Sequence, residues 1–123
     1  MQFMLMHYET EAELARRDSP TEAPSYWAAW NDYIAALSQS GIVRGGNGLM
    51  PSRTATTVRV VNGQRRVQDG PFAETREHLG GYFIIDVPSL DVALEWAARS
   101  PSAAAGSTEV RPVMPPPPGA PVA

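Results

Sequence analysis

The sequence predicts one α+β domain of the ferredoxin-like type, with the order strand, helix, strand, strand, helix, strand and a β-hairpin inserted in the middle. Three observations predict this class: two strands that are apolar on both faces, two segments with apolar residues at helical spacing, and an Asn-Gly dipeptide between two β-rich runs. A chain of 123 residues has room for one such domain. We expect the domain to span residues 1–114 and the Pro-rich segment 115–123 to be a disordered tail.

The first strand, Gln2–Tyr8, and the central strand, Leu79–Val87, are the two that are apolar on both faces. Side chains alternate between the faces of a strand, so one face of the first strand carries Phe3, Leu5 and His7, and the other carries Met4, Met6 and Tyr8. A ferredoxin-like sheet carries both helices on one side, and a single copy would leave the other side as an apolar patch in water. We therefore predict a homodimer in which two sheets stack as a dimeric α+β barrel.

Two helices are predicted from their apolar spacing. The first covers Ser25–Ser40, is capped by Ser25 and stops at Gly41. Its expected inward residues are Trp27, Trp30, Ile34 and Leu37. The second helix covers Leu90–Ser100, with expected inward residues Leu90, Leu94 and Ala97. The polar segment Glu9–Pro24 is expected to be a loop with a helical turn, and Thr108–Val113 to be the last strand.

The hairpin is predicted from Asn62-Gly63, which lies between the runs 55–61 and 64–68. Pairing Val61 with Gln64 would place Arg59 directly opposite Arg66. Two like charges across a rung are unfavourable unless an anion or an acidic side chain lies between them. Arg59 and Arg66 are therefore candidates for binding an anionic ligand, although a solvated polar face is the more ordinary role for such residues.

Composition excludes several classes of protein. The chain has no cysteine, which removes disulfides, thiolate metal sites and a cysteine nucleophile, and fits a reducing cytoplasm. The net charge is −3 and all cations are scattered arginines, so we expect no direct binding of nucleic acid. The N-terminal run is expected to be a strand and not a signal peptide, and no segment is long and apolar enough to span a membrane. No metal-ligand spacing is present, and we expect neither a metal nor a cofactor.

The segment Asp69-Gly70-Pro71-Phe72-Ala73-Glu74-Thr75-Arg76-Glu77, with Leu79-Gly80-Gly81-Tyr82 after it, resembles the signature of DGPF-type, YCII-related proteins. Motifs before the hairpin and near the C-terminus extend this resemblance over residues 1 to about 114. The resemblance implies a dimeric α+β barrel. It also implies a link to extracytoplasmic-function sigma factors, beside which such proteins are often encoded, and a fold class that includes lyases, isomerases and monooxygenases. His78 stands where another residue is expected, so it inherits no family role.

Asp69 and His7 are the candidate catalytic residues. Asp69 would act as a general base if partial burial raised its pKa toward neutrality. The alternative, which we expect, is a turn residue that accepts backbone N–H bonds ahead of Gly70-Pro71. His7 lies in a strand expected to be buried on both sides, where it would be either a proton shuttle or a hydrogen-bonded interior residue.

A charge cluster of Glu74, Arg76 and Glu77 follows the hairpin and is the remaining candidate for ligand binding, together with Arg59 and Arg66. A solvated or structural ion-pair network is the alternative, because exposed pairs are common and contribute little.

These observations favour a small-molecule-binding protein or an enzyme, lyase- or isomerase-like, with a pocket between the sheet and the helices. The alternatives are a non-catalytic partner or regulator in a sigma-factor system, implied only by the family resemblance, and a purely structural dimer. The sequence alone does not decide whether the protein is an enzyme.

Overall fold

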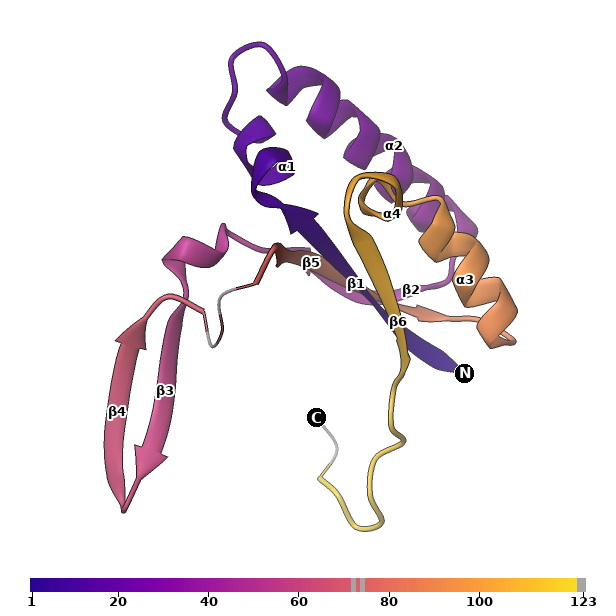
Figure 1. The fold of residues 1–123 in the computed structure, drawn as a ribbon. Coiled ribbons are helices and arrows are strands. Elements are labelled where there is room, and N and C mark those ends of the chain that lie inside the picture. Colours follow the sequence, from indigo (N-terminus) through magenta and orange to yellow (C-terminus); the bar gives the residue numbers. More distant parts are fainter. Residues whose placement is uncertain (72, 74, 122–123) are drawn as a thin grey trace.

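The computed structural model describes residues 1–71, 73 and 75–121 of the chain. Its main sheet has four antiparallel strands in the order β2-β5-β1-β6. These strands are β1 (Gln2–Thr10), β2 (Val43–Gly48), β5 (Glu77–Asp86) and β6 (Ser107–Pro112). Figure 1 shows the long helix α2 (Ala23–Ser40) and the helix α3 (Leu90–Ala98) on the same side of this sheet. The arrangement confirms a mixed α+β fold consistent with the ferredoxin-like class.

The two faces of β1 divide as the alternation predicts. Phe3, Leu5 and His7 are buried against the helices, whereas Met4 and Met6 are only partly buried. The register of β1 with β5 extends this division across the sheet. The side away from the helices, called here the helix-free face, carries Met4, Met6, Tyr8, Tyr82 and Ile84.

Helix α2 packs with a face that matches the predicted one in part, because Trp30 and Leu37 are buried as expected. The buried side chains are Tyr26, Trp30, Tyr33 and Leu37, and the expected inward residues Trp27 and Ile34 are exposed. Both sets fit helical spacing, but the two tyrosines are accommodated because their hydroxyls find partners on Glu9 and on the carbonyl of Trp96. The helix also begins at Ala23, so Ser25 lies inside it and is not its cap, whereas Gly41 ends it with a positive φ of 76°.

The C-terminal helical region also differs from the prediction. In α3 Ala97 is buried as expected, together with Ala93, whereas Leu90 and Leu94, also expected to face inward, are exposed. Small alanines let the helix approach the sheet closely, and leucines at the same positions would hold it away. The helix ends at Ala98, and a second short helix, α4 (Pro101–Ala105), begins at a proline that cannot continue α3.

The segment after β1, expected to be a loop with a helical turn, holds the helix α1 (Glu11–Arg16). Thr10 caps this helix, because its hydroxyl accepts a hydrogen bond from the backbone N–H of Glu13.

Strands β3 (Thr56–Val61) and β4 (Gln64–Asp69) form a separate hairpin, which follows the 3-10 helix η1 (Ser52–Thr54) along the chain. Asn62 and Gly63 both have positive φ, at 51° and 75°, as the two central residues of a type I′ turn require. Arg59 pairs with Arg66, which is the predicted register. In Figure 1 the hairpin projects away from the four-stranded sheet.

Candidate functional site

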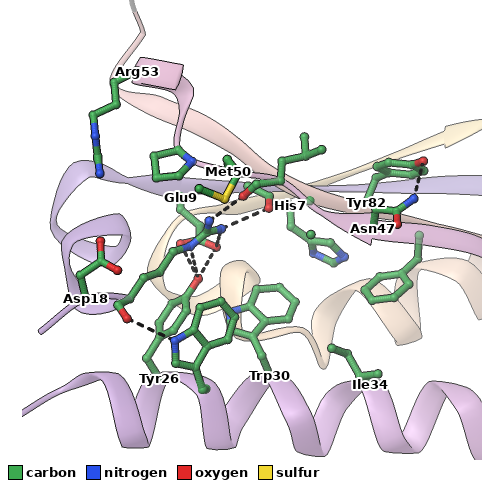
Figure 2. Close-up of a pocket in the computed structure, with 18 residues that line it drawn as sticks. His7, Glu9, Asp18, Tyr26, Trp30, Ile34, Asn47, Met50, Arg53 and Tyr82 are labelled. Carbon is green, nitrogen blue, oxygen red and sulfur yellow. Dashed lines mark hydrogen bonds and ion pairs between the residues drawn. The ribbon is translucent and has the colours of Figure 1, made fainter. Parts of the chain in front are cut away.

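A cavity of about 520 Å³ lies between α2 and the sheet (Figure 2). Helix α2 contributes the apolar side chains of Trp27, Trp30 and Ile34, and the sheet contributes Phe83. The segment Leu49–Pro51, which leads to the hairpin, borders it from another side. The exposed positions of Trp27 and Ile34 are thereby explained, since these side chains face a cavity instead of the packed core. The register of β2 and β5 places the side chains of Asn47 and Tyr82 on the helix-free face, so these strands border the cavity with their backbone there.

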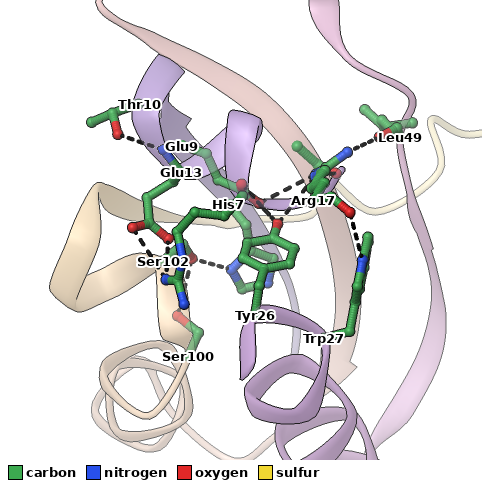
Figure 3. A network of polar contacts seen from close by, with 12 residues as sticks. His7, Glu9, Thr10, Glu13, Arg17, Tyr26, Trp27, Leu49, Ser100 and Ser102 are labelled. Atoms are coloured by element: carbon green, nitrogen blue, oxygen red, sulfur yellow. Dashed lines mark hydrogen bonds and ion pairs between the residues drawn. The ribbon is translucent and has the colours of Figure 1, made fainter. Parts of the chain in front are cut away.

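One end of the cavity is closed by a polar network of Glu9, Arg17 and Tyr26 (Figure 3). The Tyr26 hydroxyl donates to the Glu9 carboxylate, at 2.6 and 2.8 Å from its two oxygens, and accepts from Nε of Arg17 at 3.1 Å. Nη2 of Arg17 donates to Glu9 at 3.2 Å. Glu9 is buried, and the Arg17 side chain is only 11% exposed.

Arg17 also joins this network to the backbone of two other segments. It donates to the carbonyl oxygens of Leu49, at 2.7 Å, and of Gly80, at 3.1 Å. Gly80 is the extra residue of a β-bulge in β5, because His7 pairs with Gly81 and Tyr8 with Leu79. A Cβ at Gly80 would lie 2.8 Å from both Nη2 of Arg17 and Oε1 of Glu9, so the network in its present geometry leaves no room for a side chain there. The adjacent glycines Gly80 and Gly81 thus mark a bulge at which other groups approach the backbone closely.

The pKa values of Tyr26 and Arg17 are both raised, so each keeps its proton at neutral pH. Burial raises the pKa of Tyr26 to about 12, and the hydrogen bond to Glu9 acts in the same direction. Burial alone would lower the pKa of Arg17, but the hydrogen bond to Tyr26 and the charge of Glu9 raise it overall. The trio is thus a closed ion pair with a neutral phenol, suited to holding the cavity in shape. Sequence reasoning missed it, because Glu9 and Arg17 were placed in an expected loop.

His7 borders the interior of the cavity. It is 1% exposed, and its ring meets those of Trp30, Tyr33 and Phe83 edge-on at 5.0, 5.9 and 5.6 Å between centroids. Burial lowers the pKa of His7 to about 4, so the imidazole is neutral at neutral pH.

The two ring nitrogens of His7 differ. Nδ1 shares a hydrogen bond of 2.8 Å with the hydroxyl of Ser102. Ser102 continues to Thr108 at 2.7 Å, and Thr108 to Ser100 at 2.8 Å, which makes a buried chain of hydroxyls behind the ring. Nε2, also buried, has no hydrogen-bond partner among the residues that the structure describes. In either neutral tautomer, His7 therefore keeps one ring nitrogen without a hydrogen bond to the described residues.

The other predicted site residues lie elsewhere. Asp69 is exposed at the end of β4 and is not among the described residues that line the cavity. Arg59 and Arg66 face each other on the hairpin, and Arg76 is exposed. Glu77, at the start of β5, accepts a hydrogen bond from the Ser107 hydroxyl. Glu74 lies outside the described residues. The structure thus brings His7 to the cavity and does not bring Asp69 near it; their roles stay predictions.

The described residues include neither a cluster of metal ligands nor a helix that could span a membrane. They contain no group of three or more His, Asp or Glu side chains placed to hold a metal ion. No helix among them is long and apolar enough to cross a membrane.

The model of the YCII-related domain matches residues 1–116, with the cavity and its network inside the matched region. The chain belongs to the YCII-related family. This YCII-related protein is 47% identical over 88 residues to an uncharacterised protein of Rhizobium meliloti (strain 1021), a match that covers 70% of this chain and 68% of the relative.

A solved structure shows the same fold at low identity. It is the 5-chloro-2-hydroxyhydroquinone dehydrochlorinase of Burkholderia phenoliruptrix, in complex with 2,5-dihydroxybenzoquinone. The TM-score is 0.54 at 16% identity, over 93% of this chain and 94% of the dehydrochlorinase chain.

Proposed function

We propose that this YCII-related protein binds a small planar molecule with hydroxyl or carbonyl groups in the cavity between α2 and the sheet, and that it acts on this molecule by proton transfer at His7. The observation that carries the proposal is an aromatic-walled cavity of about 520 Å³ bordered by a buried imidazole whose Nε2 has no partner among the described residues. The volume is in the range of roughly 300–1,000 Å³ that small-molecule sites occupy.

The walls set the class of ligand. Trp27, Trp30 and Phe83 offer aromatic surface on which a flat ring packs well. The neutral His7 offers one donor or one acceptor, which suits a hydroxyl or a carbonyl oxygen. The dehydrochlorinase of similar fold was solved with a dihydroxybenzoquinone, a flat ring with both kinds of oxygen, and this supports the same class here.

The low pKa of His7 favours a proton transfer in which the imidazole ring stays neutral. A cationic imidazole is unfavourable at this position near neutral pH, because burial holds its pKa at about 4. A relay avoids that charge: Nε2 takes a proton from the ligand while Nδ1 gives its own proton to the Ser102 hydroxyl. Ser102 passes its own proton to Thr108, and Thr108, which is only partly buried, releases its hydroxyl proton to solvent, so the ring only changes tautomer. Proton removal of this kind is the step that isomerases and lyases share.

Titration calorimetry with 2,5-dihydroxybenzoquinone tests binding. We expect the native protein to bind, and His7→Phe, which keeps a ring but removes Nε2, to bind at least tenfold more weakly. Leu94→Ala is the matched control, because Leu94 is an exposed residue of α3 that is not among the described lining residues. Absence of binding at millimolar concentrations of hydroxylated quinones and phenols would refute the proposed ligand class.

Nitrogen NMR of His7 tests the relay separately. The two tautomers give distinct Nδ1 and Nε2 shifts, and we expect bound ligand to change their populations in the native protein. In Ser102→Ala the bound ligand should change the tautomer less, since Nδ1 keeps only the longer contact of 3.4 Å to the Thr108 hydroxyl. An imidazolium signal at neutral pH in the complex would contradict a relay that keeps the ring neutral.

Three predictions from the sequence are also part of this proposal: a cytoplasmic location, a homodimer and a disordered tail at 115–123. A role as partner or regulator of an extracytoplasmic-function sigma factor finds no support in the family match or in the two similar proteins.

A further inference from the structure

We propose that the β3–β4 hairpin is an arm that docks on a second copy of this chain, through the hairpin face that carries Val58, Val60 and Val67. The inference concerns a surface apart from the cavity and does not depend on the proposed function.

The valine face is apolar and open to solvent. Residues that pair directly across an antiparallel hairpin share a face, and Val58 pairs with Val67. Val60 lies two residues from Val58 and therefore on the same side. These valines are 57%, 71% and 55% exposed for Val58, Val60 and Val67, although β-branched side chains at paired positions stabilise a sheet mainly when something covers them.

The hairpin also has no strand of its own domain paired with it among the described residues. Its two strands form a sheet of their own. The contacts at its base are local: the N–H of Gly70 donates to the Ala55 carbonyl, and the Thr57 hydroxyl to the Gly70 carbonyl. A two-stranded hairpin by itself is at best marginally stable in water, so this arm needs a partner surface to be stable.

Charge favours another copy of the chain as the partner, although of the three arginines only Arg65 lies on the valine face, and Arg59 and Arg66 lie on the opposite face. The hairpin Thr56–Asp69 contains three arginines and one aspartate, a net charge of +2, within a chain whose net charge is −3. The rest of the chain therefore carries −5. An arm of one sign on a body of the opposite sign is attracted to the body of a second copy, and the same complementarity disfavours contact between two arms.

The body also offers apolar surface for the valines. The helix-free face presents Met4, Met6, Tyr8, Tyr82 and Ile84, all partly exposed and uncovered by the helices of their own chain. Each strand of the arm has six residues and so extends about 20 Å, enough to lie across several strands at their spacing of about 4.8 Å. The arm follows Leu49–Pro51, which borders the cavity, so docking would also fix that wall.

Neighbouring valines provide a matched pair of variants. Val60 lies on the proposed docking face, and Val61 lies on the opposite face, paired with Gln64. Val60→Asp puts a carboxylate opposite Arg65, a favourable cross-strand pair, so the hairpin itself should persist. Light scattering across micromolar concentrations would measure the mass of the native protein, Val60→Asp and Val61→Asp, with circular dichroism to confirm that each is folded.

We expect about twice the chain mass of 13.3 kDa for the native protein and for Val61→Asp, and at least a tenfold weaker association for Val60→Asp. A native mass of 13.3 kDa at every concentration would overturn the proposal and leave the arm to a different partner. A Val60→Asp dimer of native strength would also overturn it, and so would equal losses in the two variants. Ligand binding in the cavity plays no part in these measurements, so they can fail while the proposed function stands.

Discussion

Two buried polar residues that line the cavity, Glu9 and His7, differ in how fully they are hydrogen-bonded. Glu9 and His7 are two residues apart on the same face of β1, and both are buried. The Glu9 carboxylate is bound by Tyr26 and Arg17, whereas His7 keeps one ring nitrogen without a partner among the described residues. This difference supports the proposal that His7, and not Glu9, takes part in proton transfer.

Arg17→Met breaks the closed end and should have the largest effect. The change leaves the Glu9 carboxylate buried without its cation and removes the links to Leu49 and Gly80. Losing one member of a buried ion pair costs about 3–5 kcal/mol, and we expect a loss of that order in the free energy of unfolding by urea. Arg44→Met is the control, since Arg44 is an exposed arginine whose nearest carboxylate, on Asp86, is 3.9 Å away. Equal losses in the two variants would show that the Glu9 network is not what holds this end.

The pH dependence of the free energy of unfolding tests the burial of neutral His7. The pKa of His7 is about 4 in the folded protein, against 6.5 for a free histidine, so between these values the unfolded chain binds a proton that the folded chain does not. Stability from this group is therefore complete above pH 6.5 and is lost as the pH falls toward 4, by up to about 3 kcal/mol. Urea unfolding at several pH values should show this decline in the native protein. His7→Phe should flatten it, and a decline of equal size in that variant would assign it to other groups.

The sequence predicts local features of this molecule better than long-range ones. Gly41 and Asn62-Gly63 could be assigned because a positive φ at a helix end or in a tight turn is decided by neighbours along the chain. The division of β1 into two faces follows from alternation alone.

The long-range features depend on partners that no local pattern contains. Ser102 lies 95 positions from His7, and its hydroxyl resembles that of any helix serine until the fold brings the two together. The inward face of α2 was misassigned for a similar reason, because Tyr26 is tolerated in the core only through its bond to Glu9, on another element. Helical spacing alone assigns Trp27 and Ile34 to the core, whereas in the structure these two side chains line the cavity.

Gly80→Ala should have the smallest effect of the three changes, and it distinguishes a rigid network from an adaptable one. The added methyl group would lie 2.8 Å from both Arg17 and Glu9, so one of these side chains must move and weaken its hydrogen bonds. Overpacking of this kind costs about 1–3 kcal/mol. Gly48→Ala is the matched control, because Gly48 also borders the cavity in a strand but has no atom within 4 Å of the added group. Thermal unfolding of both variants would measure the difference. If Gly80→Ala were as stable as Gly48→Ala, the Glu9–Arg17 pair would have room to rearrange. The network around Glu9 would then be less rigid than its hydrogen bonds indicate, and Glu9 and His7 would differ less.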